Sequence, residues 1–303
     1  MTNLSQELAQ FIVDFDAREI PDLVCDGTSA STSSLAGLAT AGSAHSIVSA
    51  TLSALSSISN REQVGLLGRT ERLGLCDGPI VTGVSMSSAS HELDRGGEGG
   101  RFAAPVVAAA LAAGEYTAAS GPDTLAAISI GVEVAARLEC AMSPALATAG
   151  WSSGAAGARL GAAAAAGRLM ALTVDQMVSA LGLAATQAAG FKVVTSSGCS
   201  DLLDAKAAGD GMEAVMLART GFHGPAAPIE GRRGLLEVLA PRQHNLQALS
   251  DGLGTAWLVQ SPADSPDLGR RLGCPQTLAA ALALPTAPDL NRLYAASLED
   301  KGA

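Results

Sequence analysis

The chain has 303 residues, of which 48% are hydrophobic and 16% charged, so it can form a sizeable core and is not disordered as a whole. Its formal charge of −10 and its three lysines argue against partners such as nucleic acid or anionic lipid, and its longest apolar stretch, residues 103–113, is too short to span a membrane. Because the N-terminus lacks the basic segment of a signal peptide and the five cysteines are scattered, we expect a cytoplasmic protein with no metal site and no cofactor.

The composition favours helices. Alanine and 34 glycines dominate the chain while aromatic residues make up 3%, and alanine is the best helix former and is depleted in strands. Residues 4–15 repeat apolar side chains at helical spacing, with Ser5 as a candidate N-cap. Residues 27–60 are either a low-complexity linker or, as we prefer from their leucine spacing, two helices rich in small residues. Residues 74–101 contain many glycines and are expected to form a loop.

A series of helices follows. We expect them at residues 105–120, 121–139, 155–171, 177–190 and 206–220, with Thr173–Gln176 as the capping sequence that opens the fourth. From residue 241 onward the chain is irregular, with short helices at 275–284 and 289–298. Long runs of strand-like alternation are absent. The glycine pattern of residues 154–161 lies among helices, which favours helix packing over nucleotide binding.

Several stretches, read in order, resemble the MmgE/PrpD family, which includes methylcitrate dehydratase, cis-aconitate decarboxylase and iminodisuccinate epimerase. They begin with LAQFIVDFDAREIPD and SMSSASHELD, continue with PVVAAALAAGE and SGPDTLAAISIGVEVAARLE, and end with the long segments that start at Gly150 and at Lys206. The resemblance implies an all-helical domain, usually a homodimer, with a separate α/β lid inserted before a short C-terminal helical return.

The lid is missing from this sequence. We expect one helical domain over residues 1–303, with a main body at 1–258, a short segment at 259–271 where the family lid would be inserted, and a helical return at 272–303. So short a segment cannot fold into a domain. The predicted fold is therefore an all-α bundle without a lid, and helices such as 155–171 could pack closely across a dimer interface.

The resemblance also locates the site, where the sequence departs from the family pattern. Asp94 is retained and His91 precedes it, but Arg95, Glu98 and Arg101 follow where the family has a His-Pro. In the turn Gly150-Trp151-Ser152, Ser152 occupies the place of the family's histidine. In residues 200–208 the family's lysine and histidine are both replaced, although Lys206 lies nearby.

We assign roles to these positions as hypotheses. The candidate catalytic residues are Asp94, Ser152, Asp201 and Asp204, as proton-transfer groups or hydrogen-bond donors. The candidate substrate-binding residues are His91, Arg95, Glu98, Arg101, Trp151, Ser153, Lys192 and Lys206. Each set has a structural alternative: a solvated charged loop, a core tryptophan with helix-capping serines, or a mixed-charge stretch that includes Asp210 at a helix N-terminus.

Two functions of different kind remain open. The first is a cofactor-independent lyase, isomerase or cyclase that acts on a bulky biosynthetic intermediate in an open cleft, by proton transfer or by templating its conformation. The second is a noncatalytic subunit that forms a heterodimer with a complete homologue. A third, weaker hypothesis is a dehydratase or epimerase of small di- or tricarboxylic acids.

Overall fold

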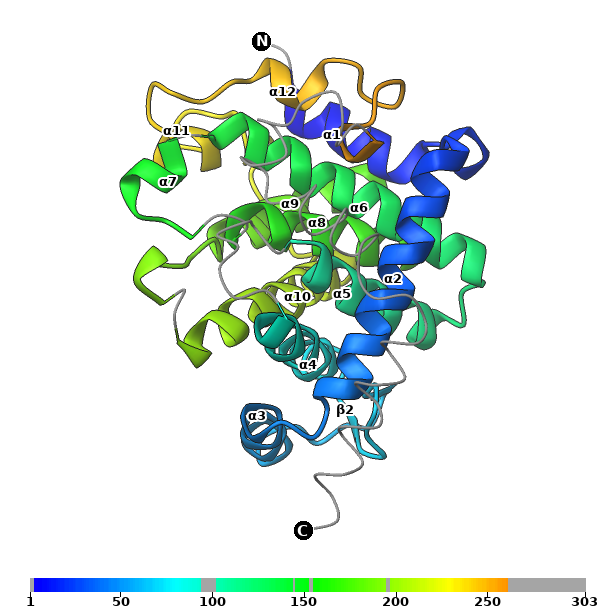
Figure 1. The fold of residues 1–303 in the computed structure, drawn as a ribbon. Coiled ribbons are helices and arrows are strands. Elements are labelled where there is room, and N and C mark those ends of the chain that lie inside the picture. The colour runs from blue at the N-terminus through cyan, green and yellow to red at the C-terminus, as the bar shows by residue number, and fades with distance from the viewer. Residues whose placement is uncertain (1–2, 94–101, 144, 153–154, 195–196, 261–303) are drawn as a thin grey trace.

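The computed structural model describes residues 3–93, 102–143, 145–152, 155–194 and 197–260, and this part of the chain is all-α (Figure 1). Its helices are α1 (Leu4–Asp14), α2 (Asp22–Gly42), α3 (Ser46–Ser56), α4 (Gly78–Leu93), α5 (Ala103–Thr117), α6 (Gly121–Met142), α7 (Ala145–Ala149), α8 (Ala155–Leu169), α9 (Val174–Thr186), α10 (Gly198–Arg219), α11 (Leu235–Leu239) and α12 (Gln247–Ser250). Short 3₁₀ turns η1 (Ala17–Glu19), η2 (Lys192–Val194) and η3 (Leu258–Gln260) connect them. Strands β1 (Val64–Gly65) and β2 (Arg72–Leu73) form a small antiparallel hairpin. The predicted all-α class is confirmed.

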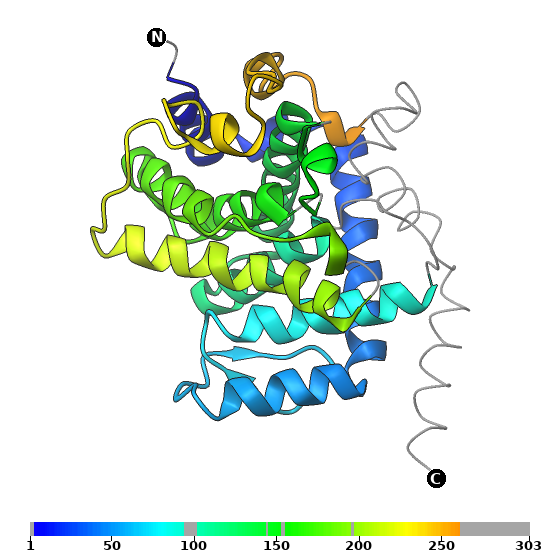
Figure 2. The same cartoon turned by 90° about the vertical axis from the view of Figure 1, so that its left-hand side faces the viewer.

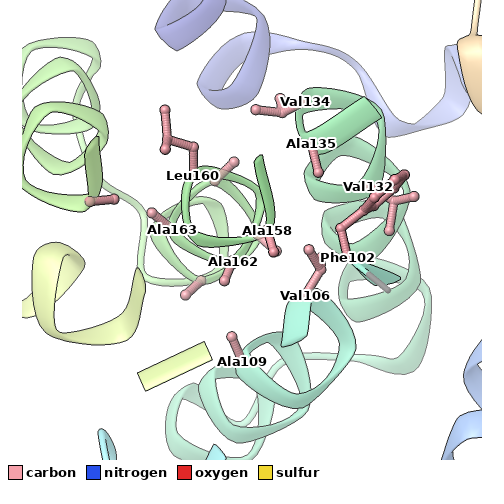
Figure 3. Packing of buried hydrophobic residues seen from close by; sticks show 14 of the residues in the cluster. Phe102, Val106, Ala109, Val132, Val134, Ala135, Ala158, Leu160, Ala162 and Ala163 are labelled. Carbon is pink, nitrogen blue, oxygen red and sulfur yellow. The ribbon is translucent and has the colours of Figure 1, made fainter. Parts of the chain in front are cut away.

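Helix α8 is the centre of the bundle, in contact with α5, α6, α9 and α10 (Figure 3). Small residues let the backbones approach closely: a Cβ added at Gly161 would lie 2.6 Å from the carbonyl oxygen of Gly131 on α6. Residues 156–167 are all buried within this one chain. The expectation that this helix packs across a dimer interface is therefore wrong, because neighbouring helices of the same chain already cover it.

Helix α4 corrects the expected loop at residues 74–101. Pro79 stands in its first turn, where a missing N–H costs no helical hydrogen bond. Its buried serines return their hydroxyls to the helix, since Ser85 Oγ donates to the Val81 carbonyl at 3.0 Å and Ser88 Oγ to the Val84 carbonyl at 2.7 Å. A glycine- and serine-rich sequence is thus a buried helix here. Residues 74–77 do form a turn before this helix, and residues 94–101 of the expected loop lie outside the described residues.

The helices predicted in the N-terminal part of the chain are present in the structure. The preferred interpretation of residues 27–60 as two helices is confirmed by α2 and α3. Helix α1 also forms, but its cap is the Asn3 side chain rather than Ser5, whose hydroxyl instead donates to Glu230 Oε2 at 2.5 Å. The capping sequence before α9 is confirmed, since Thr173 and Gln176 form a reciprocal capping box.

Helix α10 begins eight residues earlier than expected, at Gly198 rather than at residue 206. This difference places Asp201 and Asp204 within the helix, in its first two turns. Gly157 and Gly161 of the glycine pattern at residues 154–161 lie in α8 and pack against α6, so the packing interpretation is confirmed for these two glycines. The expected helices at 275–284 and 289–298 lie outside the described residues.

The last described segment is fixed to α6 by a buried ion pair. Arg137 Nε donates to Glu133 Oε1 at 2.7 Å, and both side chains are 1% exposed. The remaining Arg137 donors bind backbone carbonyls of the following segment, at Ala248, Leu249, Asp251, Gly252 and Ala256. Trp257 packs edge-on against Phe11 and Phe15 of the N-terminal segment. Among the described helices, none is both long enough and apolar enough to cross a membrane.

Candidate functional site

Three helix ends meet on one side of the molecule. Gly83 of α4 contacts Ala205 of α10, and Ile80 contacts Gly209, so the two helices run antiparallel. The last turn of α4, which carries His91, therefore lies beside the first turns of α10 (Figure 2). The N-terminal half of α8 packs along the other side of α10. We call the surface formed by these helix ends the site face.

A backbone bridge borders the site face. The N–H of Ser152 donates to the Gly190 carbonyl at 3.0 Å, and the N–H of Lys192 donates to the Gly150 carbonyl at 2.9 Å. The ring of Trp151 stacks on that of Phe191, with centroids 5.9 Å apart and an interplanar angle of 23°. Ser152 is buried, whereas Trp151 is half-buried at the edge of the core. Trp151 thus lies at the rim of the bundle, whereas Ser152 is covered by its neighbours.

A charged cluster of Arg159, Lys206 and Asp210 lies between α8 and α10. Arg159 Nε donates to Asp210 Oδ2 at 2.8 Å, and the two side chains are 3% and 5% exposed. Lys206, which is 46% exposed, pairs with the other oxygen of the same carboxylate. Arg159 Nη1 also donates to the Ala189 carbonyl at 3.3 Å, which joins the cluster to the bridge. The buried guanidinium therefore holds the carboxylate, and the ammonium group stands on its solvent side.

Two further carboxylates lie in the first two turns of α10, on a different face of the helix from Lys206 and Asp210. Asp201 is buried in the first turn, and Asp204 is half-buried one turn later. Residues three apart share a helix face, so the two side chains are neighbours. The helix dipole alone would favour acidic residues at this terminus. The N-terminal half of α10 nevertheless carries carboxylates that can accept a proton and, on another face, an ammonium group that can bind an acid.

The structure brings together only part of the predicted site. Ser152, Trp151 and Lys192 meet at the backbone bridge, while Asp201, Asp204 and Lys206 lie along α10. The backbone of His91 is in α4, but its side chain is outside the described residues. Residues Asp94, Arg95, Glu98, Arg101 and Ser153 also lie outside them.

Sequence reasoning missed Arg159 and gave Asp210 no role. The available signal was a single arginine in the small-residue run GARLGAAAAAG. A cation in a helix that is buried on all sides needs a partner, because an unpaired buried charge is very costly. Asp210, four residues after Lys206, was the matching acid. Within the described ranges, no group of three or more His, Cys, Asp or Glu side chains gathers as a metal site would require.

Comparison with known proteins agrees with this architecture. Residues 6–247 match the MmgE/PrpD N-terminal domain. A stretch of 107 residues is 38% identical to the cis-aconitate decarboxylase-like protein oryM of Aspergillus oryzae, and it covers 35% of this chain but 22% of that protein. The match thus reaches only a minor part of the relative's length. Since the domain match extends over most of the chain, this protein belongs to the MmgE/PrpD family.

Proposed function

We propose that this chain is an enzyme of the lyase, isomerase or cyclase type, which moves a proton on a bound small molecule without a cofactor. The observation that carries the proposal is the charged cluster of the site face, where Arg159 and Lys206 share the Asp210 carboxylate. Lys206 is the exposed member, so its ammonium group is placed to bind a substrate carboxylate or the negative charge that develops when a carbon acid loses a proton. Membership of a family of dehydratases, decarboxylases and epimerases supports the same class of chemistry.

The remaining roles follow from position. Asp201 and Asp204 lie one turn apart on α10 and supply carboxylates that can accept and return a proton. Ser152 supplies a hydroxyl at the backbone bridge, and Trp151, stacked on Phe191, supplies an apolar wall. Asp94 would complete the set as the retained family carboxylate.

The proposed substrate is a bulky biosynthetic intermediate. Segment 259–271 is too short to form a lid domain, so the site face would be open and accessible to water. Water access weakens electrostatic catalysis, so an open site favours chemistry that tolerates water. Epimerisation or ring closure therefore fits this site better than decarboxylation. We further propose that the protein is a cytoplasmic homodimer.

Two alternatives each have one observation in their favour. Ser152, together with Ser200 and Leu203, stands where the family has its histidines and lysine, which favours a noncatalytic subunit of a heterodimer. The printed name of the Aspergillus relative, cis-aconitate decarboxylase-like, favours a reaction on small carboxylic acids.

The discriminating experiment is proton NMR of substrate turnover in deuterated buffer. The purified protein is incubated first with cis-aconitate, methylcitrate and iminodisuccinate, then with larger carboxylate-bearing intermediates. We expect no change in the small acids and deuterium incorporation into a larger compound. Turnover of a small acid would instead support the ordinary family reaction. Inertness toward both panels, combined with tight association with a full-length homologue, would support the noncatalytic subunit.

Variants then test the residues. Lys206→Gln should lower the rate of deuterium incorporation by about 100-fold, a typical loss for a proton-transfer or charge-stabilising group. Arg219→Gln provides the control, because Arg219 is an exposed cation at the opposite end of the same helix. Asp94→Asn should have an effect as large as Lys206→Gln. Full activity in Lys206→Gln would overturn the assignment of the cluster.

A further inference from the structure

A cavity of about 380 Å³ lies at the N-terminal end of α4, between the β1–β2 hairpin and α5. Its size is within the range of small-molecule sites. Apolar side chains form part of its wall, among them Leu66 of the hairpin loop, Pro79 of α4, and Leu111 and Ala112 of α5. We call it the hairpin cavity. It is separate from the site face, because α4 has 16 residues and about 20 Å therefore lie between its two ends.

Arg69 brings a fixed positive charge to the hairpin cavity. Gly68 has a φ of 74°, in the left-handed region, and turns the hairpin loop toward the C-terminal end of α2 (Figure 1). There Arg69 Nε donates to the Ser43 carbonyl and Nη2 to Ser49 Oγ, each at 2.7 Å. Both acceptors are neutral, and no carboxylate of the described residues pairs with Arg69. The dipole of α2 compensates only part of a unit charge, so the guanidinium is held in place with a positive charge to spare.

The other charged groups of the cavity set the charge of its ligand. Arg72 Nη2 donates to Glu115 Oε1 at 2.8 Å, and the second oxygen of that carboxylate accepts the N–H of Gly65 at 2.9 Å. This pair is therefore already compensated. Glu71 also lines the cavity, but it is exposed to solvent. A singly charged anion fits Arg69, whereas a doubly charged anion such as phosphate would be repelled by the two glutamates.

A buried hydroxyl without a partner also lines the cavity. Thr82, in the second turn of α4, is 6% exposed. Ser85 and Ser88 of the same helix donate their hydroxyls to carbonyls one turn earlier, whereas the Thr82 hydroxyl forms no hydrogen bond with a described residue. A buried polar group that lacks a partner is costly, so a polar ligand atom in the cavity would be stabilised by this hydroxyl.

We propose that the hairpin cavity binds a small organic monocarboxylate with a short apolar body. The carboxylate pairs with Arg69, whose Nη1 is left free by the hydrogen bonds at Nε and Nη2. The Thr82 hydroxyl supplies a further donor, and Leu111 and Ala112 contact the hydrocarbon part of the ligand. This inference goes beyond the proposed function and does not depend on it, because the cavity lies at the other end of α4 from the site face.

Isothermal titration calorimetry of the full-length protein with butyrate, isovalerate and isocaproate tests the proposal. We expect isocaproate, which has the longest apolar body of the three, to bind saturably at one site. Isocaproamide has the same shape but no charge, so its affinity should be lower by about tenfold or more. Equal affinities for the acid and the amide, or no saturable binding of any of the three acids up to about 10 mM, would overturn the proposal.

Variants locate the binding. Arg69→Gln should weaken isocaproate binding by about tenfold or more, and Thr82→Val by about fivefold, because each removes one donor. Ala112→Leu should abolish binding by filling the cavity. Arg61→Gln, an exposed cation that does not line the cavity, and Lys206→Gln on the site face are the controls and should leave the affinity unchanged. Circular dichroism verifies that each variant is folded. An unchanged affinity in folded Arg69→Gln, or a loss in Lys206→Gln, would refute binding in the hairpin cavity.

Discussion

Replacement of Arg137 with methionine should destabilise the folded protein by about 4 kcal/mol. Arg137 and Glu133 form an ion pair with almost no exposure to solvent, and the arginine also donates to carbonyls of the segment from Ala248 to Ala256. Methionine fills a similar volume but provides no charge and no donor. The substitution would therefore leave a buried carboxylate without its cation and several carbonyls without a partner.

The magnitude follows from the geometry. Removal of one member of a buried ion pair typically costs about 3–5 kcal/mol, because the remaining charge is uncompensated. Loss of the carbonyl hydrogen bonds acts in the same direction, while water that enters beside the exposed Asp251 limits the effect. Glu133→Gln should cost less, since its single amide oxygen can still accept one of the two N–H groups, from Leu258 or Val259, that the two carboxylate oxygens accept in the parent.

Urea denaturation monitored by circular dichroism measures these differences. Arg18→Met is the control, because Arg18 pairs with Asp16 at the surface and its side chain is 89% exposed. This control should unfold at the same urea concentration as the parent. A loss below about 1 kcal/mol for Arg137→Met would refute the reasoning, since the segment would then be held by apolar contacts alone.

The stability lost in Arg137→Met should also depend on pH. Burial raises the pKa of the Glu133 carboxyl above its ordinary value, and Arg137 and the N–H groups of Leu258 and Val259 oppose that rise. Without Arg137 the pKa rises further. A carboxyl whose pKa is higher in the folded than in the unfolded protein contributes stability at low pH, which is lost as the pH rises through the folded pKa. The deficit of Arg137→Met should thus be larger at about pH 8 than at about pH 5. Equal deficits would exclude the Glu133 charge as their source.

Three other predictions concern packing, thiols and the site. Gly161→Ala should lower the free energy of unfolding by about 1–3 kcal/mol, because the added methyl group forces α8 away from α6. Gly121→Ala is the control, since there is open space where its Cβ would lie, and it should not destabilise the protein. Thermal unfolding curves of the two variants test this difference. Iodoacetamide at neutral pH should label the exposed Cys199 quickly and the buried Cys140 slowly, and mass spectrometry of timed samples would reveal a reversed order. Trp151→Ala should abolish deuterium incorporation into the substrate while leaving the circular dichroism spectrum intact, and full activity would remove Trp151 from the site.

Helices with a clear apolar period or a capping sequence could be predicted from the sequence. The capping box before α9 is local chemistry, and so is the spacing of α1, which is why both were expected near their observed positions. Helix α4 was not expected, because its stability comes from burial between α2 and α10 rather than from its own composition. Tertiary packing of this kind overrides the helix-breaking tendency of glycine.

The candidate site was predictable only in part, again because tertiary packing decides which residues meet. Trp151, Ser152 and Lys206 were predicted through resemblance to the family, and they stay predictions. Arg159 was not found, since its role depends on the register of α8 against α10, where Gly211 packs on the Arg159 backbone. Sequence shows a lone charge in a helix, but only the helix packing shows which acid it meets.

Close helix packing also explains why the charged groups of this chain concentrate where they do. Small residues bring α6, α8 and α10 so near that a long charged side chain has no room to reach solvent between them, and it must be paired inside. The chain has two such buried pairs among the described residues, Arg137–Glu133 and Arg159–Asp210, but they differ in one respect. In the first pair, Arg137 also donates to backbone carbonyls of the segment that follows, such as those of Asp251 and Ala256. That segment covers the pair, so the role of the pair is structural. The second carries a half-exposed Lys206 on its outer oxygen, so it is the pair from which charge reaches the surface, and we propose that a substrate binds there.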